Sequence, residues 1–152
     1  MRIVDSHFHW WPRSVFTELQ KRTDYPMAEP NNKGGYKVWT AKGVNRTGAW
    51  AEWFDLDGLM AHENAQGFDV DVVCSTGPIS MIFSECEAKL GHGLSQIWND
   101  EMEAAQRKHA GRLWASGVVS LVDPKLAIDE LERCMKMGDR KSTRLNSSHG
   151  YI

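Results

Sequence analysis

The sequence predicts an α/β domain built on a parallel sheet, because short apolar segments alternate with amphipathic ones along its 152 residues. Arg2-Ile3-Val4 leads into a strand near the N-terminus, and the mainly apolar run 70–75 is typical of a strand covered on both faces. The apolar segment 113–122 is expected to be the third strand. Asp123-Pro124 follows it and favours a helix start, since Asp caps a helix and Pro fits its first turn. A helix is the usual crossover between parallel strands, so the repeated strand-then-helix order predicts parallel pairing.

The first strand leads into a helix over 13–22 and then into a long connection over 24–54 that is rich in proline, glycine and aromatic residues. Connections of this length inside a compact domain are usually functional or disordered, and the aromatic content argues against a plain disordered linker. We therefore expect an aromatic insertion with a small β excursion near Tyr36–Thr40. Two roles stay open for it: a lid over a site, or a packed structural insertion.

Capping residues place the later helices. Asp55 or Asp57 is expected to cap a helix that ends at Gly67, and Ser95 to cap a second one after the segment 91–93. The second helix should end at Gly111, and the helix that starts at Asp123-Pro124 should end at Gly138. The apolar stripe of this last helix is predicted to consist of Ala127, Ile128, Leu131, Cys134 and Met135.

The composition excludes several classes of protein. The chain is 41% hydrophobic and 25% charged with a formal net charge of −2, a balance that indicates neither a nucleic-acid-binding nor a membrane-binding protein. The N-terminus does not resemble a secretory signal, and no apolar run is long enough for a bilayer span. The three cysteines lack CxxC spacing and are odd in number, which argues against a zinc ribbon or a disulfide framework. We expect a cytoplasmic protein.

The segment Asp5-Ser6-His7-Phe8-His9 carries the main indication of function. Side chains alternate along a strand, so His7 and His9 should project from the same face, with Asp5 one layer beneath them. Two neighbouring imidazoles can bind one metal ion at Zn–N distances of about 2.0–2.1 Å. Asp5 is then a candidate to support the ligands from behind. The alternative is a chance pair of core or surface histidines.

This Asp-x-His-x-His pattern resembles the first strand of the amidohydrolase superfamily, and more closely the amidohydrolase-related group that includes aminocarboxymuconate-semialdehyde decarboxylase. Segments 67–73 and 113–133 resemble later strands and a helix of that family, so the resemblance covers about residues 1–138. It implies a (β/α)8 TIM barrel of the metal-dependent hydrolase type. A complete barrel needs about 250 residues, and this chain holds about three βα units. We therefore expect an N-terminal part of a truncated barrel.

The resemblance also implies the chemistry. His7 and His9 would be two ligands of one divalent metal ion, with zinc as the expected metal, and Asp5 would lie behind them. A histidine from a fifth strand, another from a sixth and an aspartate from an eighth would complete the site, and none of these can be assigned within residues 1–138. Trp10, Trp11 and Thr76 are candidates for the substrate pocket.

The expected activity of the parent protein is hydrolysis of a C–N or C–O bond, such as that of a lactone, or non-oxidative decarboxylation of a carboxylic acid. The expected partner is a small-molecule substrate, with no nucleic acid and no membrane, and the parent could form a homo-oligomer. The 152-residue chain itself is expected to be inactive. Two alternatives remain: a TatD-like metallonuclease, which also begins with His-x-His, and a non-enzymatic α/β binding module.

The last segment, residues 139–152, differs from the rest of the chain. It holds three hydrophobic residues among fourteen, where a barrel requires a buried fourth strand. The run 140–149 resembles the translation of a sequencing-library adapter. We therefore expect 139–152 to be a non-native tail without a packed role.

Overall fold

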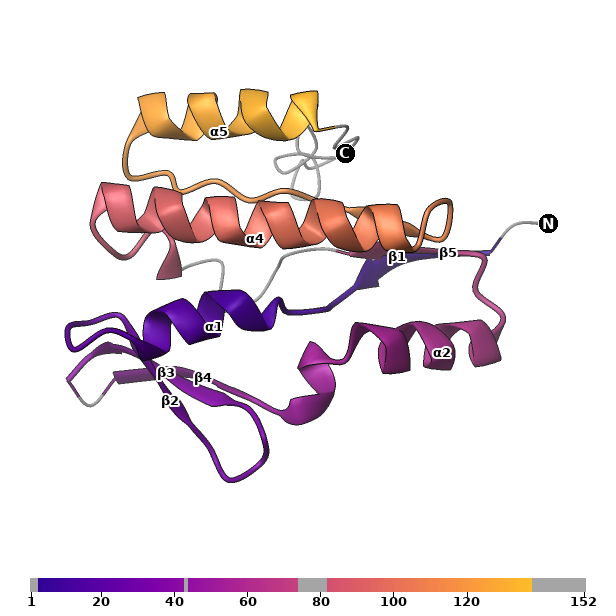
Figure 1. The fold of residues 1–152 in the computed structure, drawn as a ribbon, viewed down its shortest axis with the longest axis horizontal. Coiled ribbons are helices and arrows are strands. Elements are labelled where there is room, and N and C mark those ends of the chain that lie inside the picture. The colour runs from indigo at the N-terminus through magenta and orange to yellow at the C-terminus, as the bar shows by residue number, and fades with distance from the viewer. Residues whose placement is uncertain (1–2, 43, 74–81, 138–152) are drawn as a thin grey trace, which may run out of the picture.

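The computed structural model describes residues 3–42, 44–73 and 82–137 and places them in a mixed fold of helices and two small sheets (Figure 1). The predicted pocket residue Thr76 and the tail 139–152 lie outside the described residues. None of the helices in the described part of the chain is long and apolar enough to cross a membrane.

The first sheet is parallel, as predicted. It contains β1 (Val4–Phe8), β5 (Val70–Val73) and β6 (Leu113–Ala115) in the spatial order β1-β5-β6. Both pairs, β1 with β5 and β5 with β6, run parallel. The spatial order of the strands follows their order along the chain, which is the arrangement that successive βα units produce.

Capping residues begin two of the helices where the sequence predicted, and one of the two also ends at its predicted glycine; Gly138, the predicted end of the other, lies outside the described residues. Helix α2 (Leu56–Gln66) is capped by Asp55, whose Oδ1 accepts a hydrogen bond from Gly58 N at 3.0 Å, and it ends at Gly67 with φ of 83°. Helix α5 (Pro124–Lys136) is capped by Asp123, whose Oδ1 accepts hydrogen bonds from the N–H groups of Lys125 and Leu126. Local sequence determines these boundaries because each cap is satisfied within a few residues.

Helix α4 (Ala88–Lys108) contradicts the prediction of a start at Ser95, because it runs through the segment 91–93. Gly91 occurs there for packing: a Cβ at this position would lie 2.0 Å from the carbonyl oxygen of Phe83. Ser95 does not cap the helix, and its Oγ instead donates to Gly91 O at 2.9 Å. The glycine permits a close approach between α4 and the preceding segment, and no break in the helix follows from it.

The third parallel strand is also shorter than predicted, since β6 ends at Ala115 and not near Val122. The side chain of Asn99 on α4 replaces a strand partner here. Its Nδ2 donates to Val118 O at 2.8 Å, and its Oδ1 accepts from Val118 N at 2.7 Å. Both backbone groups of Val118 are therefore satisfied without a sheet.

The aromatic connection is more ordered than the sequence indicated. After helix α1 (Arg13–Gln20) it forms an antiparallel meander of β2 (Met27–Pro30), β3 (Tyr36–Ala41) and β4 (Val44–Ala49), followed by the 3₁₀ helix η1 (Ala51–Phe54). This small sheet lies against α1, which in turn contacts α4 (Figure 1).

The burial of the meander indicates a structural role. Val38 is fully buried, Tyr36 and Ala49 are buried beside it, and the ring of Tyr36 lies 5.3 Å from that of Phe16 on α1. Gly35, the residue before β3, is required by the close approach of the chain to the end of β4, because a Cβ there would lie 1.9 Å from Ala49 O. Of the two roles considered, the packed insertion agrees with this burial.

Helix α5 differs from its predicted apolar stripe. Ile128 and Met135 are exposed, whereas the carboxylate Glu130 is 1% exposed. Glu130 accepts hydrogen bonds from Arg133 Nε and Nη2 at 2.8 Å each and from Asn99 Nδ2 at 2.6 Å. Although burial raises its pKa, the hydrogen bonds from Arg133 and Asn99 hold the pKa of the Glu130 carboxyl below its usual range. A buried polar network thus joins α5 to α4 and to the segment after β6.

We expect deletion of residues 139–152 to leave the stability of the chain unchanged within about 0.5 kcal/mol, as for ordinary surface changes. The reason is the sequence of this segment, which offers little apolar surface to bury. Thermal unfolding of chains 1–138 and 1–152, followed by circular dichroism, measures the difference. A clear loss of stability in the shorter chain would show that the segment belongs to the fold.

Candidate functional site

His7 and His9 lie side by side at the carboxyl end of β1. Their Nε2 atoms are 2.9 Å apart, and their rings meet edge to face with centroids separated by 4.5 Å. His7 is exposed and His9 is half-buried. The strand alternation expected from the sequence is therefore observed at these two side chains. The 2.9 Å contact is a hydrogen bond between the two ring nitrogens, and the tautomers decide which ring donates.

The spacing of the two imidazoles is close to that of two ligands on one metal ion. Two nitrogen ligands at about 2.0–2.1 Å from one tetrahedral ion are about 3.3–3.4 Å apart. The Nε2–Nε2 distance of 2.9 Å is shorter than this and is also a hydrogen-bonding distance. The pair thus presents two imidazole nitrogens, which are a ligand type that zinc sites use.

Asp5 supports the pair through the backbone. Its Oδ1 accepts a hydrogen bond from His7 N at 2.9 Å, and the carboxylate is half-buried. The register of β1 with β5 shifts between Asp5 and Phe8, which marks an irregularity in the strand at this point. Such irregularities re-aim side chains near functional sites. The contact in the structure is to the main chain of His7, so Asp5 fixes the position from which the imidazole projects.

Trp10 and Trp11 lie in the hydrophobic core, at 7% and 3% exposure. Trp10 Nε1 donates to Phe54 O at 3.4 Å, and the Trp11 ring stacks on Phe16 at 5.8 Å. Neither lines the hollow that contains the histidines. The structure therefore places both tryptophans in the core, and neither side chain reaches the hollow beside the histidines.

An open hollow of about 350 Å³ lies beside the histidine pair. Asp5, His7 and His9 line it from the β1 segment, and the remaining lining residues come from η1 and α2: Glu52, Trp53, Leu59 and Glu63. In the sequence, Trp53 is only one of the aromatic residues of the insertion, and no motif marks Glu52, Leu59 or Glu63. No local pattern identifies these residues, because their place beside β1 depends on how the insertion returns to the strand.

The return of the insertion to the strand is held by a backbone hydrogen bond, in which Trp11 N donates to Trp53 O at 3.0 Å.

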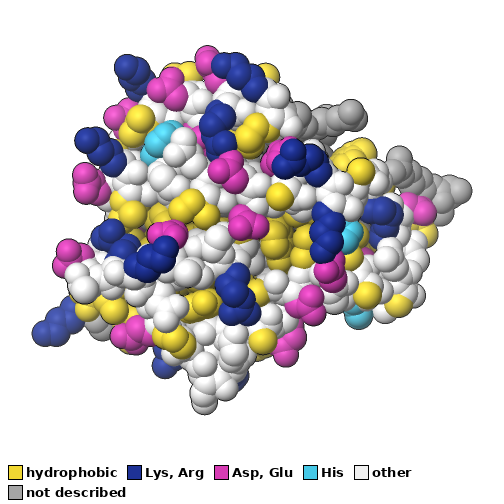
Figure 2. Space-filling model, viewed as in Figure 1, with side chains coloured by type: hydrophobic (Ala, Val, Ile, Leu, Met, Phe, Trp, Pro, Cys, Tyr) yellow, Lys and Arg dark blue, Asp and Glu magenta, His cyan; other side chains and the backbone are white. Residues whose placement is uncertain are grey.

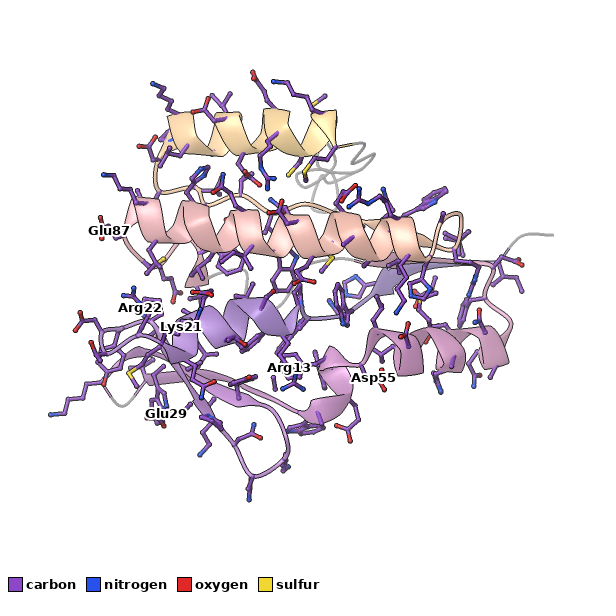
Figure 3. All side chains as sticks on the ribbon, viewed as in Figure 1. Arg13, Lys21, Arg22, Glu29, Asp55 and Glu87 are labelled. Carbon is purple, nitrogen blue, oxygen red and sulfur yellow. The ribbon has the colours of Figure 1, made fainter. Side chains whose placement is uncertain are left out.

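Arg13, labelled in Figure 3, lies with its guanidinium 4.4 Å from the ring centroid of Phe54 and is not among the residues that line the hollow. On the face seen in Figure 2, positive and negative side chains are interspersed, and that face shows no continuous basic stripe.

Within residues 3–42, 44–73 and 82–137, no group of three or more His, Cys, Asp and Glu side chains is placed to hold a metal ion. His62 is exposed on α2, His92 is half-buried on α4, and His109 faces Asp57 at 3.3 Å. None of them lines the hollow. The described part of the chain therefore brings together two imidazoles and a supporting carboxylate.

Searches with protein-family models and among curated proteins find no match to this sequence. Among solved structures, the fold is similar to that of 5-carboxyvanillate decarboxylase from Sphingomonas paucimobilis, with a TM-score of 0.62 and 19% sequence identity. The match covers 88% of this chain and 39% of that one. At this identity the likeness concerns the fold alone, and the chain spans well under half of the decarboxylase.

Proposed function

We propose that this chain is the N-terminal part of a metal-dependent enzyme of the amidohydrolase type. Its reaction would be hydrolysis of a C–N or C–O bond or non-oxidative decarboxylation of a carboxylic acid. The observation that carries the proposal is the 2.9 Å approach of His7 Nε2 to His9 Nε2 at the carboxyl end of a parallel strand. Enzymes built on parallel α/β barrels place their active sites at this end of the strands.

In this proposal His7 and His9 bind one divalent ion, with zinc as the expected metal, through their Nε2 atoms. Asp5 holds the His7 backbone through the 2.9 Å hydrogen bond and so limits the movement of the imidazole. A bound ion would supply Lewis acidity, which polarises a carbonyl or carboxylate group of the substrate. The other ligands and the acid–base groups would come from sequence beyond the described residues.

The fold likeness supports the same class of enzyme. A decarboxylase has a similar fold over most of this chain, and the Asp5-x-His7-x-His9 motif independently resembles a family that contains decarboxylases and hydrolases. Decarboxylation of an aromatic acid is therefore the first activity to assay, with lactone hydrolysis second.

The metal assignment can be tested on the full-length parent protein, in which we expect barrel sequence to follow residue 138 in place of the segment 139–152. We expect about one zinc per chain by plasma mass spectrometry of the purified protein. The double variant His7→Ala/His9→Ala should lose at least 90% of that metal, since catalytic zinc sites use about three protein ligands. His62→Ala is the matched control, because His62 is exposed on α2 and does not line the hollow. A double variant that keeps its metal would refute the assignment.

The same preparations separate the alternative functions. Metal-dependent cleavage of DNA without decarboxylase or lactonase activity would favour the TatD-like nuclease. A parent protein with neither bound metal nor turnover would favour a non-enzymatic binding module.

A further inference from the structure

The hollow beside the histidine pair has one aromatic wall, formed by Trp53. This side chain is 36% exposed and lines the hollow together with His7 and His9. Trp11, which is 3% exposed, holds Trp53 through two contacts. Its backbone N donates to Trp53 O at 3.0 Å, and the centroids of the two rings lie 4.5 Å apart. A flat apolar surface is thus held beside the imidazoles before any ligand arrives, and such preorganisation favours binding.

The other lining residues make this wall acidic. Apart from the two histidines and Leu59, the residues that line the hollow are the carboxylates Asp5, Glu52 and Glu63, and among the described residues no lysine or arginine lines it. Two cations of this region contact other rings: Arg13 lies over Phe54, and Lys33 lies 4.6 Å from the ring centroid of Trp50. A negative potential at this wall disfavours an anionic group and favours a neutral or positive one.

We propose, on the basis of the function proposed above, that Trp53 binds a flat, unsaturated part of the substrate that is neutral or positively charged. Glu52 and Glu63 set this charge preference, and Trp53 supplies the stacking surface beside His7 and His9. A substrate carboxylate, if the reaction uses one, is then oriented away from Glu52 and Glu63. The described wall thus selects the class of substrate by shape and by charge.

The test uses three probes with the same flat ring and different charges: benzamidinium, benzamide and benzoate. Their binding to the metal-depleted full-length parent protein is measured by calorimetry, so that benzoate gains nothing from a metal ion. We expect benzamidinium to bind about tenfold more tightly than benzoate, as a cation–π contact and two nearby carboxylates would produce. The double variant Glu52→Gln/Glu63→Gln should abolish that difference.

Replacement of Trp53 by Ala should weaken benzamide and benzamidinium about tenfold, whereas Trp53→Phe should keep most of the affinity because the stacking surface remains. Trp50→Ala is the matched control. Trp50 belongs to the same insertion and is 48% exposed, but it does not line the hollow. Equal effects of Trp50→Ala and Trp53→Ala, or tighter binding of benzoate than of benzamidinium, would overturn the proposal.

Metal content distinguishes this proposal from the one on which it rests. Trp53→Ala should retain zinc, because no metal ligand is changed. If the His7/His9 double variant also retains zinc while the three probes bind as expected, the metal assignment is wrong and the proposed role of Trp53 is supported. If zinc depends on the histidines but Trp53→Ala leaves probe binding unchanged, the wall is wrong and the metal assignment stands.

Discussion

The 152-residue chain, expressed by itself, should show no metal-dependent decarboxylation or lactone hydrolysis above background. Its described residues offer two imidazoles and no third side chain placed to complete a metal site. Catalytic zinc sites use about three protein ligands and keep one position open. The acid–base residues that the family resemblance implies would also be missing, and such residues contribute typically about 10²–10⁴-fold to the rate.

The comparison is with the longer parent protein of the proposed function, assayed at equal concentration with added zinc. Turnover by the parent and none by the shorter chain is the expected result. Turnover by the 152-residue chain that disappears in His7→Ala would show that the missing ligands lie within this sequence, and that 74–81 or 138–152 supplies them.

Replacing Arg133 by Met should destabilise the protein by about 3 kcal/mol at pH 7, because removing one partner of a buried ion pair leaves the other charge uncompensated. The side chain of Glu130 has no solvent exposure, and Arg133 donates two hydrogen bonds to it at 2.8 Å. Asn99 remains as a donor to Glu130 but carries no charge. Urea unfolding of the two proteins, followed by circular dichroism, measures the difference.

The effect should depend on pH in a defined direction. In the unmodified protein, hydrogen bonds outweigh burial and lower the pKa of Glu130 in the folded state. The resulting stabilisation is present above the unfolded pKa of about 4.3 and is lost as the pH falls through the folded value. In Arg133→Met, burial acts without the compensating cation and should raise the pKa, so protonation relieves the penalty. The difference between the two proteins should therefore shrink as the pH is lowered from 7 toward 4.

Arg107→Met is the matched control for this experiment. Arg107 forms an ion pair with Glu103 one turn away on α4, but its side chain is 73% exposed. Exposed pairs contribute about 0–1 kcal/mol, so we expect little change in stability and no matching pH dependence. A similar loss of stability in both variants would show that the burial of Glu130 is not the cause.

The local sequence predicted those parts of the fold that are satisfied within a few residues. Asp55 and Asp123 cap their helices through backbone N–H groups two or three positions away, so their role can be read directly from the chain. Gly91 could not be read in this way. A glycine in a helical pattern suggests a break, and only the tertiary structure shows that Gly91 permits close packing, because a Cβ at this position would lie 2.0 Å from Phe83 O.

The end of β6 and the burial of Glu130 both differ from what the hydrophobic pattern of the sequence predicts, and both differences have the same cause. Asn99 lies 19 residues from Val118 and 31 from Glu130, and it hydrogen-bonds to both. An apolar segment such as 113–122 predicts a strand on the assumption that neighbouring strands satisfy its backbone groups. A carboxylate on a helix predicts an exposed face on the assumption that no cation or hydrogen-bond donor compensates its charge when it is buried. Both assumptions depend on contacts that are remote in sequence.

The sequence by itself determined the parallel order of strands and helices and the shared face of His7 and His9, because both follow from the alternation of side chains along short segments. The tertiary structure alone decided what lies opposite that pair. Trp53, Glu52 and Glu63 reach the hollow because the insertion folds as a meander against α1 and its end is fixed to Trp11 N. Local periodicity cannot encode a contact of this kind, since it arises between segments 42 residues apart that meet only in the folded chain.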